Sequence, residues 1–377
     1  MRVLVVHNRY RVTGGEERAV DLQLDALERA GIPHAALFRD SSETGRRRAA
    51  AAMLRGGERP EDVANAVAEL GATVVHFHNM HPLFGHRAIE AAKEAGARTV
   101  LHLHNYRLFC AIAIAFRDGD DCFRCRGRRT LPGLVLNCRD SVPQAAVYAT
   151  ALAAHEPRVL AAVDAFATPS HYAADRLVRL GLPPERLTVL ANYLPVDEIA
   201  DGSAADAGGY ALFAGRLSVE KGVAYAIDAA REARVPIKVA GDGPLADDLV
   251  RRAAGDRHVE LLGRVGAAEV RTLLGGASMA VVPSVSGDVM PFAALEGMAA
   301  GLPVAATDAG SLPEVLGSGA TVPRKDSDAL ARRMRALHDD PGARRSEGER
   351  NIARAREVYG EARYRRELVA LYEGRSA

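Results

Sequence analysis

The sequence has no excess of charge of either sign and no long hydrophobic run. Its 377 residues carry a formal net charge of +1, which gives no general reason to expect a nucleic acid partner. No apolar stretch reaches the roughly 20 residues that a membrane-spanning helix needs. The chain starts with Met-Arg-Val-Leu-Val-Val-His, which resembles a first β-strand and not a secretion signal. We therefore expect a cytoplasmic protein; peripheral contact with the inner membrane face stays open, and the oligomeric state is unknown.

What is present is a repeated alternation of short apolar runs and segments with helical spacing. The runs are Val3–Val6, Thr73–Phe77, Thr99–Leu103, Ala165–Thr168 and Leu187–Leu190, then, after a polar stretch over 196–209, Tyr210–Ala214, Ile237–Ala240, Val259–Leu262, Met279–Val282, Val304–Ala306 and Ala320–Val322. Because this alternation is typical of parallel sheets with helices on both faces, it predicts an α/β protein.

The polar stretch divides the pattern into two doubly wound, Rossmann-like domains. We expect an N-terminal domain over 1–196, a C-terminal domain over 197–354, and a last helix over 355–377 that returns to the first domain. Ligands of such sheets bind outside the carboxyl ends of the strands, so the site is expected in a cleft between the domains.

The most informative stretch begins at Asp288-Val-Met-Pro-Phe292-Ala293 and continues through Glu296 to Pro303. It places one carboxylate before a helix and a second within the first turns of that helix. Unpaired backbone N–H groups at a helix start suit a phosphate, and the second acid can accept hydrogen bonds from sugar hydroxyls. The pattern therefore predicts a nucleotide-sugar site.

Other loops follow predicted strands. Arg216 and Lys221 lie after Tyr210–Ala214, where they could hold phosphate oxygens or could simply be surface cations in a turn. Gly14 and Gly15 follow the first strand, and Gly263-Arg264-Val265 could meet a nucleobase through its backbone. Each loop alone is weak support for a ligand.

Together these segments resemble the retaining glycosyltransferases of family four, also called group one, which have the GT-B fold. The resemblance rests on Gly14-Gly15-Glu16, His104-Asn105, Asn192, Gly215-Arg216…Glu220-Lys221-Gly222, Gly241-Asp242-Gly243-Pro244 and Glu296-Gly-Met-Ala-Ala-Gly-Leu-Pro. It implies an enzyme that moves a sugar from a nucleoside diphosphate donor to a sugar, lipid or small-molecule hydroxyl. The base, the sugar and the acceptor stay undefined.

The resemblance also implies a role for each residue. The cations Arg216 and Lys221 would hold the diphosphate, and Glu296 would bind the ribose. The transferred sugar would meet Asp288 and, from the opposite domain, His104. Backbone N–H groups around Pro291–Ala293, which include Phe292, would meet the phosphates, Gly14 and Gly15 would line the diphosphate or acceptor, and Gly263 and Val265 would contact the base. Two positions depart from the family pattern: Asp288 stands where Glu is usual, and Asn105 where Asp is common.

The implied mechanism is same-face attack, in which the leaving phosphate takes the acceptor's proton and no metal ion is needed. Charge stabilisation would then come from protein cations and helix starts. An Asp-x-Asp at Asp118-Gly-Asp120 is read as a turn, since it lies in a polar loop among cysteines. Two other classes stay open: a sugar-nucleotide epimerase or hydrolase of the same two-domain plan, and a non-catalytic nucleotide-sugar-binding partner.

Two histidine pairs end adjacent predicted strands, His76-Phe-His78 and His102-Leu-His104. Residues two apart on a strand share a face, so four imidazoles could bind zinc. The absence of a regularly spaced carboxylate ligand argues against this reading, and we expect His76 and His102 to be packed and hydrogen-bonded.

All the cysteines lie in one insertion over 108–140, as Cys110-x11-Cys122-x2-Cys125-x12-Cys138. Since cytosolic disulfides are rare, this spacing indicates a structural zinc site, with four unconnected thiols as the alternative. The arginines of this insertion, Arg126 and Arg128 among them, are interpreted as a solvated face, and contact with an anionic acceptor is a weaker hypothesis.

Overall fold

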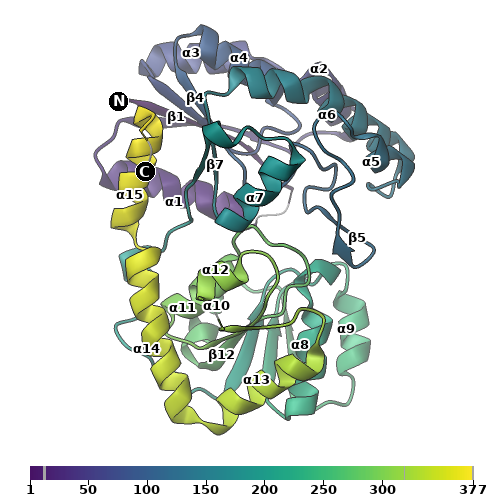
Figure 1. Ribbon diagram of the computed structural model, residues 1–377, viewed down its shortest axis with the longest axis vertical. Helices are drawn as coiled ribbons and strands as arrows, with labels where there is room; N and C mark the ends of the chain where they lie inside the picture. Colours follow the sequence, from purple (N-terminus) through teal and green to yellow (C-terminus); the bar gives the residue numbers. More distant parts are fainter. Residues whose placement is uncertain (12–13, 318, 376–377) are drawn as a thin grey trace. The chain divides into compact units, whose positions relative to one another are not determined.

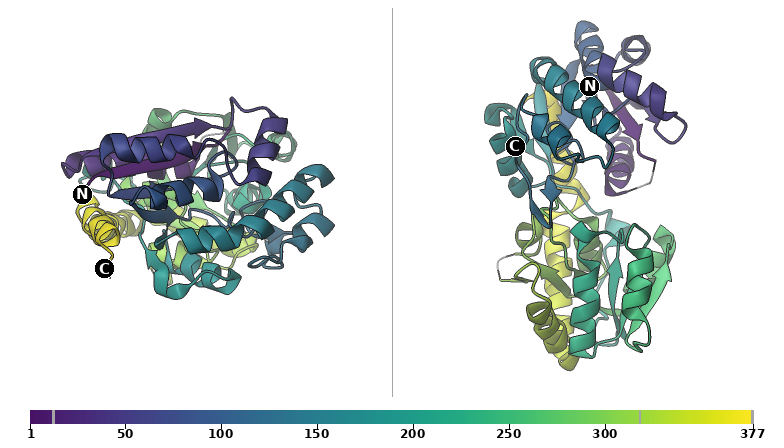
Figure 2. Two further views of the ribbon diagram at one scale, coloured as in Figure 1. Left: turned by 90° about the horizontal axis from the view of Figure 1, so that it is seen from above. Right: turned by 90° about the vertical axis from the view of Figure 1, so that its right-hand side faces the viewer.

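The computed structural model describes residues 1–11, 14–317 and 319–375, which form two compact units (Figure 1). The first unit comprises 1–115, 122–192 and 364–377, and the second comprises 116–121 and 193–363. Each unit contains a six-stranded parallel sheet with helices packed on both faces (Figure 2). The predicted α/β class with two Rossmann-like sheets is confirmed.

The first sheet has the strand order β2-β1-β3-β4-β7-β8. Its strands are β1 Val3–Arg9, β2 His34–Asp40, β3 Val74–Phe77, β4 Arg98–His102, β7 Ala165–Thr168 and β8 Leu187–Val189. The helices of this part of the chain are α1 Gly15–Arg29, α2 Arg46–Arg55, α3 Glu61–Leu70, α4 Gly85–Glu94, α5 Leu131–Val135, α6 Val142–Ala162 and α7 His171–Leu180, with a 3-10 turn at Pro184–Arg186. The order reverses between β1 and β3, so the loops after these two strands diverge and leave room for a ligand.

The second sheet has the order β11-β10-β9-β12-β13-β14, with its reversal between β9 and β12. Its strands are β9 Tyr210–Ala214, β10 Ile237–Ala240, β11 Val259–Gly263, β12 Ala277–Val282, β13 Val304–Thr307 and β14 Thr321–Val322. The helices are α8 Val223–Ala233, α9 Ala246–Ala253, α10 Ala267–Gly275, α11 Phe292–Ala299, α12 Leu312–Leu316, α13 Ser327–Asp339 and α14 Pro341–Val358, with 3-10 turns at Val196–Glu198 and Val219–Lys221.

Short, fully buried apolar runs explain why these segments become central strands. Val3, Val5 and Val6 of β1 are 0 % exposed, as is expected for a strand covered on both faces. In the second unit, apolar side chains of α8 and α13 pack with those of β9, β10 and β12 in one cluster that includes Ile227, Leu330 and Met334. Each sheet therefore has its own core, and each core holds the loops at the strand ends in place.

The last helix, α15 Glu361–Glu373, belongs to the first unit from Tyr364 onward. Leu368, Leu371 and Tyr372 are buried, and the Gln23 amide of α1 donates a hydrogen bond of 2.9 Å to the Tyr372 hydroxyl. Within the described ranges, no helix is long and apolar enough to cross a membrane.

Every apolar run singled out in the sequence contributes to a strand, but two features were missed. The strand β2 is only half-buried along most of its length, so it lacks a continuous apolar run. The second feature is a hairpin of β5 Phe116–Arg117 and β6 Asp120–Asp121. Its connecting residues Asp118 and Gly119 have φ values of 53° and 81°, which is the pattern of a tight hairpin turn, so the interpretation of this Asp-x-Asp as a turn is confirmed.

Candidate active site

Two loops meet at the point where the strand order of the second sheet reverses. Lys221, in the loop after β9, places its Nζ 2.8 Å from each carboxylate oxygen of Asp288, in the loop after β12. The Ser284 hydroxyl donates to the same carboxylate at 2.8 Å. The structure thus brings together a cation and an acid that are far apart in the sequence, at the carboxyl edge where such sheets bind ligands.

Gly222 allows these loops to approach closely. It has a φ of 69°, and a Cβ built on it would lie 1.9 Å from the Pro283 carbonyl oxygen. The backbone N–H of Val285 also donates to the Glu220 carbonyl at 3.0 Å. Any side chain at position 222 would push the loops apart, so this glycine holds Lys221 against Asp288.

Arg216 lies at the start of the same loop and is exposed. Among the residues that the structure describes, none forms a hydrogen bond or ion pair with its guanidinium. A guanidinium presents a planar set of N–H donors that matches two phosphate oxygens. Arg216 can therefore take a phosphate group without first breaking an internal ion pair.

The helix α11 begins directly after the Asp288 loop, with Pro291 as its N-cap and no capping side chain. Phe292 and Ala293, in its first turn, are half-buried, and Glu296 is half-buried one turn further along. The start of this helix therefore offers backbone N–H groups and the positive end of a helix dipole beside Lys221 and Asp288.

Gly263 and Val265 lie at the carboxyl end of β11, which is an edge strand of the second sheet. Gly263 ends β11 and is exposed, and its carbonyl accepts a hydrogen bond of 2.7 Å from the N–H of Gly241. Val265 is half-buried. Both residues lie at the carboxyl end of β11, where their backbone can contact a base.

The hairpin Phe116–Asp121 contributes a residue that the sequence did not reveal. The Asp121 carboxylate accepts a hydrogen bond of 3.3 Å from the N–H of Gly287, next to Asp288. Its other oxygen lies 3.1 Å from Nη1 of Arg324, which also donates to the Val285 carbonyl at 3.2 Å. Asp121 thus helps to fix the Ser284–Asp288 loop through Gly287 and Arg324, whereas Lys221 contacts the Asp288 carboxylate.

We predict that Asp121→Ala weakens ligand binding at this loop about tenfold, since a hydrogen bond to a charged group contributes roughly 1.5–3 kcal/mol. For the nucleotide-sugar donor expected from the sequence, the KM should rise by this factor with a smaller effect on kcat. The matched control is Asp120→Ala, because the Asp120 side chain is 66 % exposed and its contact with Arg324 is 3.4 Å long. Initial rates at varied donor concentration measure both constants. An equal KM in the two variants would contradict the role given to Asp121.

In the first unit, the loop after β1 joins the start of α1 through a polar network. The Tyr10 hydroxyl donates to the Glu16 carboxylate at 2.8 Å, and the Asn105 amide donates to the same carboxylate at 2.9 Å. Burial raises the pKa of Glu16, and the side chains of His7 and Tyr10 oppose this rise. Gly14 is the N-cap of α1, with its N–H bonded to Glu17 at 2.9 Å, and Gly15 begins the helix.

This network gives a physical reason for Asn105. An amide at this position donates to Glu16, whereas the Asp that is common in the family would place a second carboxylate against the first. Two adjacent carboxylates cannot both stay ionised at low cost. Asn105 therefore matches the half-buried carboxylate of Glu16 in this chain.

His104 follows β4 in a row of stacked imidazoles. Its Nε2 lies 2.8 Å from Nδ1 of His78, and its ring centroid is 4.0 Å from that of His102. Burial lowers the pKa of His104 well below its usual value, and the imidazoles of His102, His7 and His76 add to this effect. His104 is therefore a neutral hydrogen-bonding group.

The expectation for the other histidines is correct for His76 and partly wrong for His102. His76 is buried and hydrogen-bonded to Gln23 and Tyr372, each at 2.9 Å. His102 is buried, but within the described part of the chain neither of its ring nitrogens has a hydrogen-bond partner. The sequence showed that these side chains would be packed, but it could not show that β4 places His102 between other imidazoles.

The four cysteines are half-buried free thiols. Burial raises the pKa of Cys125 to about 11, and Cys110, Cys138 and Cys122 all contribute to this rise, so the thiols lie within electrostatic reach of one another. Only His76, His78 and His102 form a group of at least three metal-ligand atoms within 4.8 Å of one another in the part of the chain that the structure describes. The cysteines are gathered but do not form such a group.

Models of known families match nearly the whole chain. Residues 3–193 match the glycosyl transferase 4-like domain, and residues 208–340 match the glycosyl transferases group 1 family. The chain belongs to the group 1 glycosyltransferases. The predicted family is therefore confirmed.

Curated members of this family are similar to parts of the chain. A putative colanic acid biosynthesis glycosyltransferase, WcaL, from Salmonella typhimurium is 28 % identical over 179 residues, which cover 43 % of this chain and 44 % of that protein. A glycogen synthase from Mycobacterium tuberculosis is 36 % identical over 146 residues, 35 % of this chain and 34 % of that protein. The chain matches less than half the length of these relatives.

Solved structures with low sequence identity share the fold over the full length. Anabaena Alr3699/HepE in complex with UDP superposes with a TM-score of 0.67 at 16 % identity, covering 99 % of this chain and 100 % of that one. Sucrose-phosphate synthase from Thermosynechococcus elongatus gives 0.72 at 15 % identity, covering 98 % of each chain. These likenesses confirm the GT-B class for this member of the group 1 family.

Proposed function

We propose that the chain transfers a sugar, with retention of anomeric configuration, from a nucleoside diphosphate donor to a hydroxyl acceptor. The observation that carries the proposal is the Lys221–Asp288 pair at 2.8 Å beside the start of α11, where Pro291 is the N-cap. Membership of the group 1 family supports it, and so does the relative Alr3699/HepE, which binds UDP-glucose.

The donor roles follow from the positions of the side chains in the second unit. Arg216 and the N–H groups of Phe292 and Ala293 would bind the diphosphate, with Lys221 turning from Asp288 to join them. Glu296 would accept from the ribose hydroxyls, and the backbone near Gly263 and Val265 would meet the base. Once Lys221 turns to the phosphate, Asp288 is free to accept from a hydroxyl of the transferred sugar.

Same-face attack makes the departing diphosphate both leaving group and base. The acceptor oxygen bonds to the anomeric carbon as the bond from that carbon to the phosphate oxygen breaks, and the acceptor's proton passes to a diphosphate oxygen. Negative charge grows on the diphosphate in this step, so fixed positive groups stabilise the transition state more than the ground state. Arg216, Lys221 and the start of α11 supply that charge without a metal ion.

In the first unit, His104 would hydrogen-bond the sugar as a neutral imidazole, and Gly14 and Gly15 would let the backbone approach the donor or acceptor. Arg126 and Arg128 are exposed on the cysteine-containing insertion, which supports an anionic acceptor. A structural zinc ion in the same insertion would be held by Cys110, Cys122, Cys125 and Cys138; the support for it is that these four residues lie together in the sequence as a Cys-x-x-Cys with two flanking cysteines.

A thermal-shift panel of uridine, guanosine and adenosine diphosphate sugars tests donor binding. A donor at 100 times its Kd adds about 2.7 kcal/mol to the stability. Nucleotide release with candidate acceptors, with and without a chelator, then tests transfer. Nucleoside diphosphate release that requires an acceptor and persists with the chelator supports the proposal. Nucleotide release or donor conversion without an acceptor would indicate the hydrolase or epimerase. Donor binding without nucleotide release would indicate a non-catalytic binding partner. Dependence of the release on magnesium or manganese would indicate a different mechanism.

A further inference from the structure

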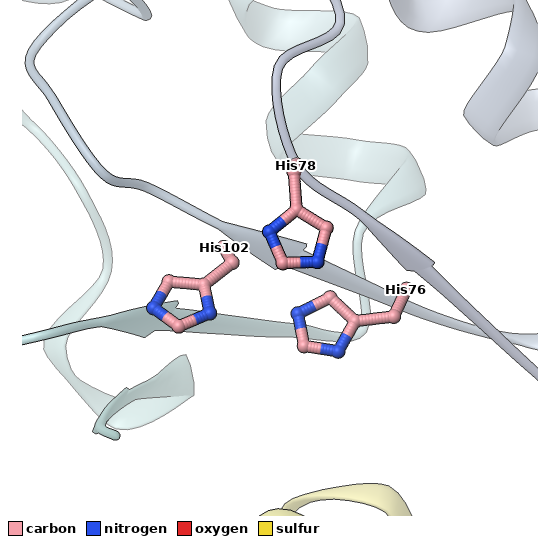
Figure 3. A group of neighbouring side chains, drawn as sticks. All are labelled: His76, His78 and His102. Carbon is pink, nitrogen blue, oxygen red and sulfur yellow. The ribbon is translucent and has the colours of Figure 1, made fainter. Parts of the chain in front are cut away.

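Three histidines of the first unit turn their rings toward one another from two neighbouring strands (Figure 3). His76 lies on β3, His78 follows it, and His102 ends β4. One nitrogen from each ring lies within 4.8 Å of the others. The ring centroids are 4.6 Å apart for His76 and His78, and 5.6 Å from each of these to His102.

The cluster contains polar atoms that the protein leaves unsatisfied. Four nitrogens are buried and have no hydrogen-bond partner among the residues that the structure describes: Nε2 of His76, Nε2 of His78 and both nitrogens of His102. The three side chains belong to residues that are 0 %, 2 % and 3 % exposed. More than 90 % of buried polar groups in proteins are paired, so several orphaned nitrogens that face one another point to a bound species.

We propose that His76, His78 and His102 bind a zinc-class transition metal ion. The neutral imidazole is the form that ligates, and all three residues are buried. Imidazole suits Zn²⁺, Ni²⁺ and Cu²⁺, whereas Mg²⁺ and Ca²⁺ prefer the oxygen ligands that this group lacks. Rings that each place one nitrogen about 2.1 Å from a tetrahedral ion have centroids roughly 5 Å apart. The observed spacings bracket that value.

Binding requires the rings to change orientation. The rings are nearly parallel, with interplanar angles of 6°, 19° and 24°, so they must tilt for their lone pairs to converge on one point. His76 must also carry its proton on Nδ1, which lies 2.9 Å from the Tyr372 hydroxyl and 2.9 Å from the Gln23 amide. An amide turned so that its oxygen faces His76 accepts that proton, as partners of metal-bound histidines commonly do.

The ion would also set the protonation of His104. A histidine that ligates through Nε2 carries its proton on Nδ1, and Nδ1 of His78 lies 2.8 Å from Nε2 of His104. His78 would then donate to His104, whose own proton would sit on Nδ1. Metal binding would thereby select one tautomer of His104.

The test uses the full chain with Cys110, Cys122, Cys125 and Cys138 replaced by serine, which removes any thiolate site, and circular dichroism first establishes that this variant folds. If it does not fold, the otherwise unchanged chain is used, and His102→Phe should then lose one bound ion per chain. Zinc content after purification without chelator is measured by elemental analysis, and Co²⁺ is then titrated into the chelator-treated protein. We expect one ion per chain, a visible Co²⁺ absorption without thiolate charge-transfer bands, and a higher melting temperature with Zn²⁺ than without it.

Variants assign the binding to this cluster. His102→Phe keeps an aromatic side chain and removes both nitrogens, so it should abolish binding of Co²⁺ and Zn²⁺. His34→Phe, on β2 of the same sheet, should leave binding unchanged. Tyr372→Phe should weaken it about tenfold through loss of the partner of His76. Absence of binding in the parent protein, or equal binding in His102→Phe, would overturn the proposal and assign the cluster to buried water.

Discussion

Lys221→Met should lower the rate of sugar transfer by roughly 10²–10³-fold, since removal of one donor to a developing oxyanion costs about that factor. Methionine keeps the length of the side chain and removes its charge. The loss should fall mainly on kcat, because the negative charge on the diphosphate grows as the bond to the sugar breaks. Steady-state release of nucleoside diphosphate measures the effect.

Two further variants separate direct action from a structural role. Lys238→Met removes a lysine of the same sheet that lies over the Tyr210 ring and should leave the rate unchanged. In the double variant Lys221→Met/Asp288→Asn, the unpaired carboxylate is also neutralised. The reference is Asp288→Asn alone, because Asp288 has its own role at the sugar. If Lys221 served only to neutralise Asp288, the double variant would be as active as Asp288→Asn, and the direct role would be wrong.

Arg344→Met should lower the free energy of unfolding by about 3 kcal/mol or more, because it leaves buried carbonyl groups without a donor. The residue is 5 % exposed. Its guanidinium donates to the carbonyls of Ala205, Asp206, Leu337 and His338 at 2.7–2.9 Å. It thereby ties the segment before β9 to the junction of α13 and α14.

The neighbouring Arg345 is a matched control for this prediction. Its side chain is 61 % exposed and lies 3.3 Å from the Asp206 carboxylate, and such surface pairs contribute about 0–1 kcal/mol. Since the chain has no tryptophan, urea unfolding is best followed by far-ultraviolet circular dichroism. Equal midpoints for Arg344→Met and Arg345→Met would show that the buried carbonyls find other partners.

The sequence was sufficient for the sheets because their central strands are short apolar runs between turn residues. Val304–Ala306, for example, was recognised as a strand because it is a short apolar run, and it forms part of β13, all of whose residues are buried. The strand β2 was missed because its half-buried residues give no such run, and the hairpin was missed because strands of two residues have no periodicity. In the sequence, neither segment can therefore be distinguished from the loops on either side of it.

The sequence predicted which residues belong to the candidate site, but it did not predict which of them contact one another. The sequence placed Lys221 and Asp288 at strand ends, yet their pairing depends on β9 and β12 being neighbours in the sheet. Asp121 carried no signal, because its role comes from the position of the hairpin beside Gly287. The departure at Asn105 is likewise explained only by the nearby Glu16 carboxylate.

Neither compact unit is a continuous piece of chain, and this limits how the protein can be divided. A fragment ending at Asn192 would lack Tyr364–Ala377, so the surfaces that Leu368, Leu371 and Tyr372 cover would face water. It should be prone to aggregation when expressed alone. A synthetic peptide spanning the missing segment should restore its solubility by reassociation.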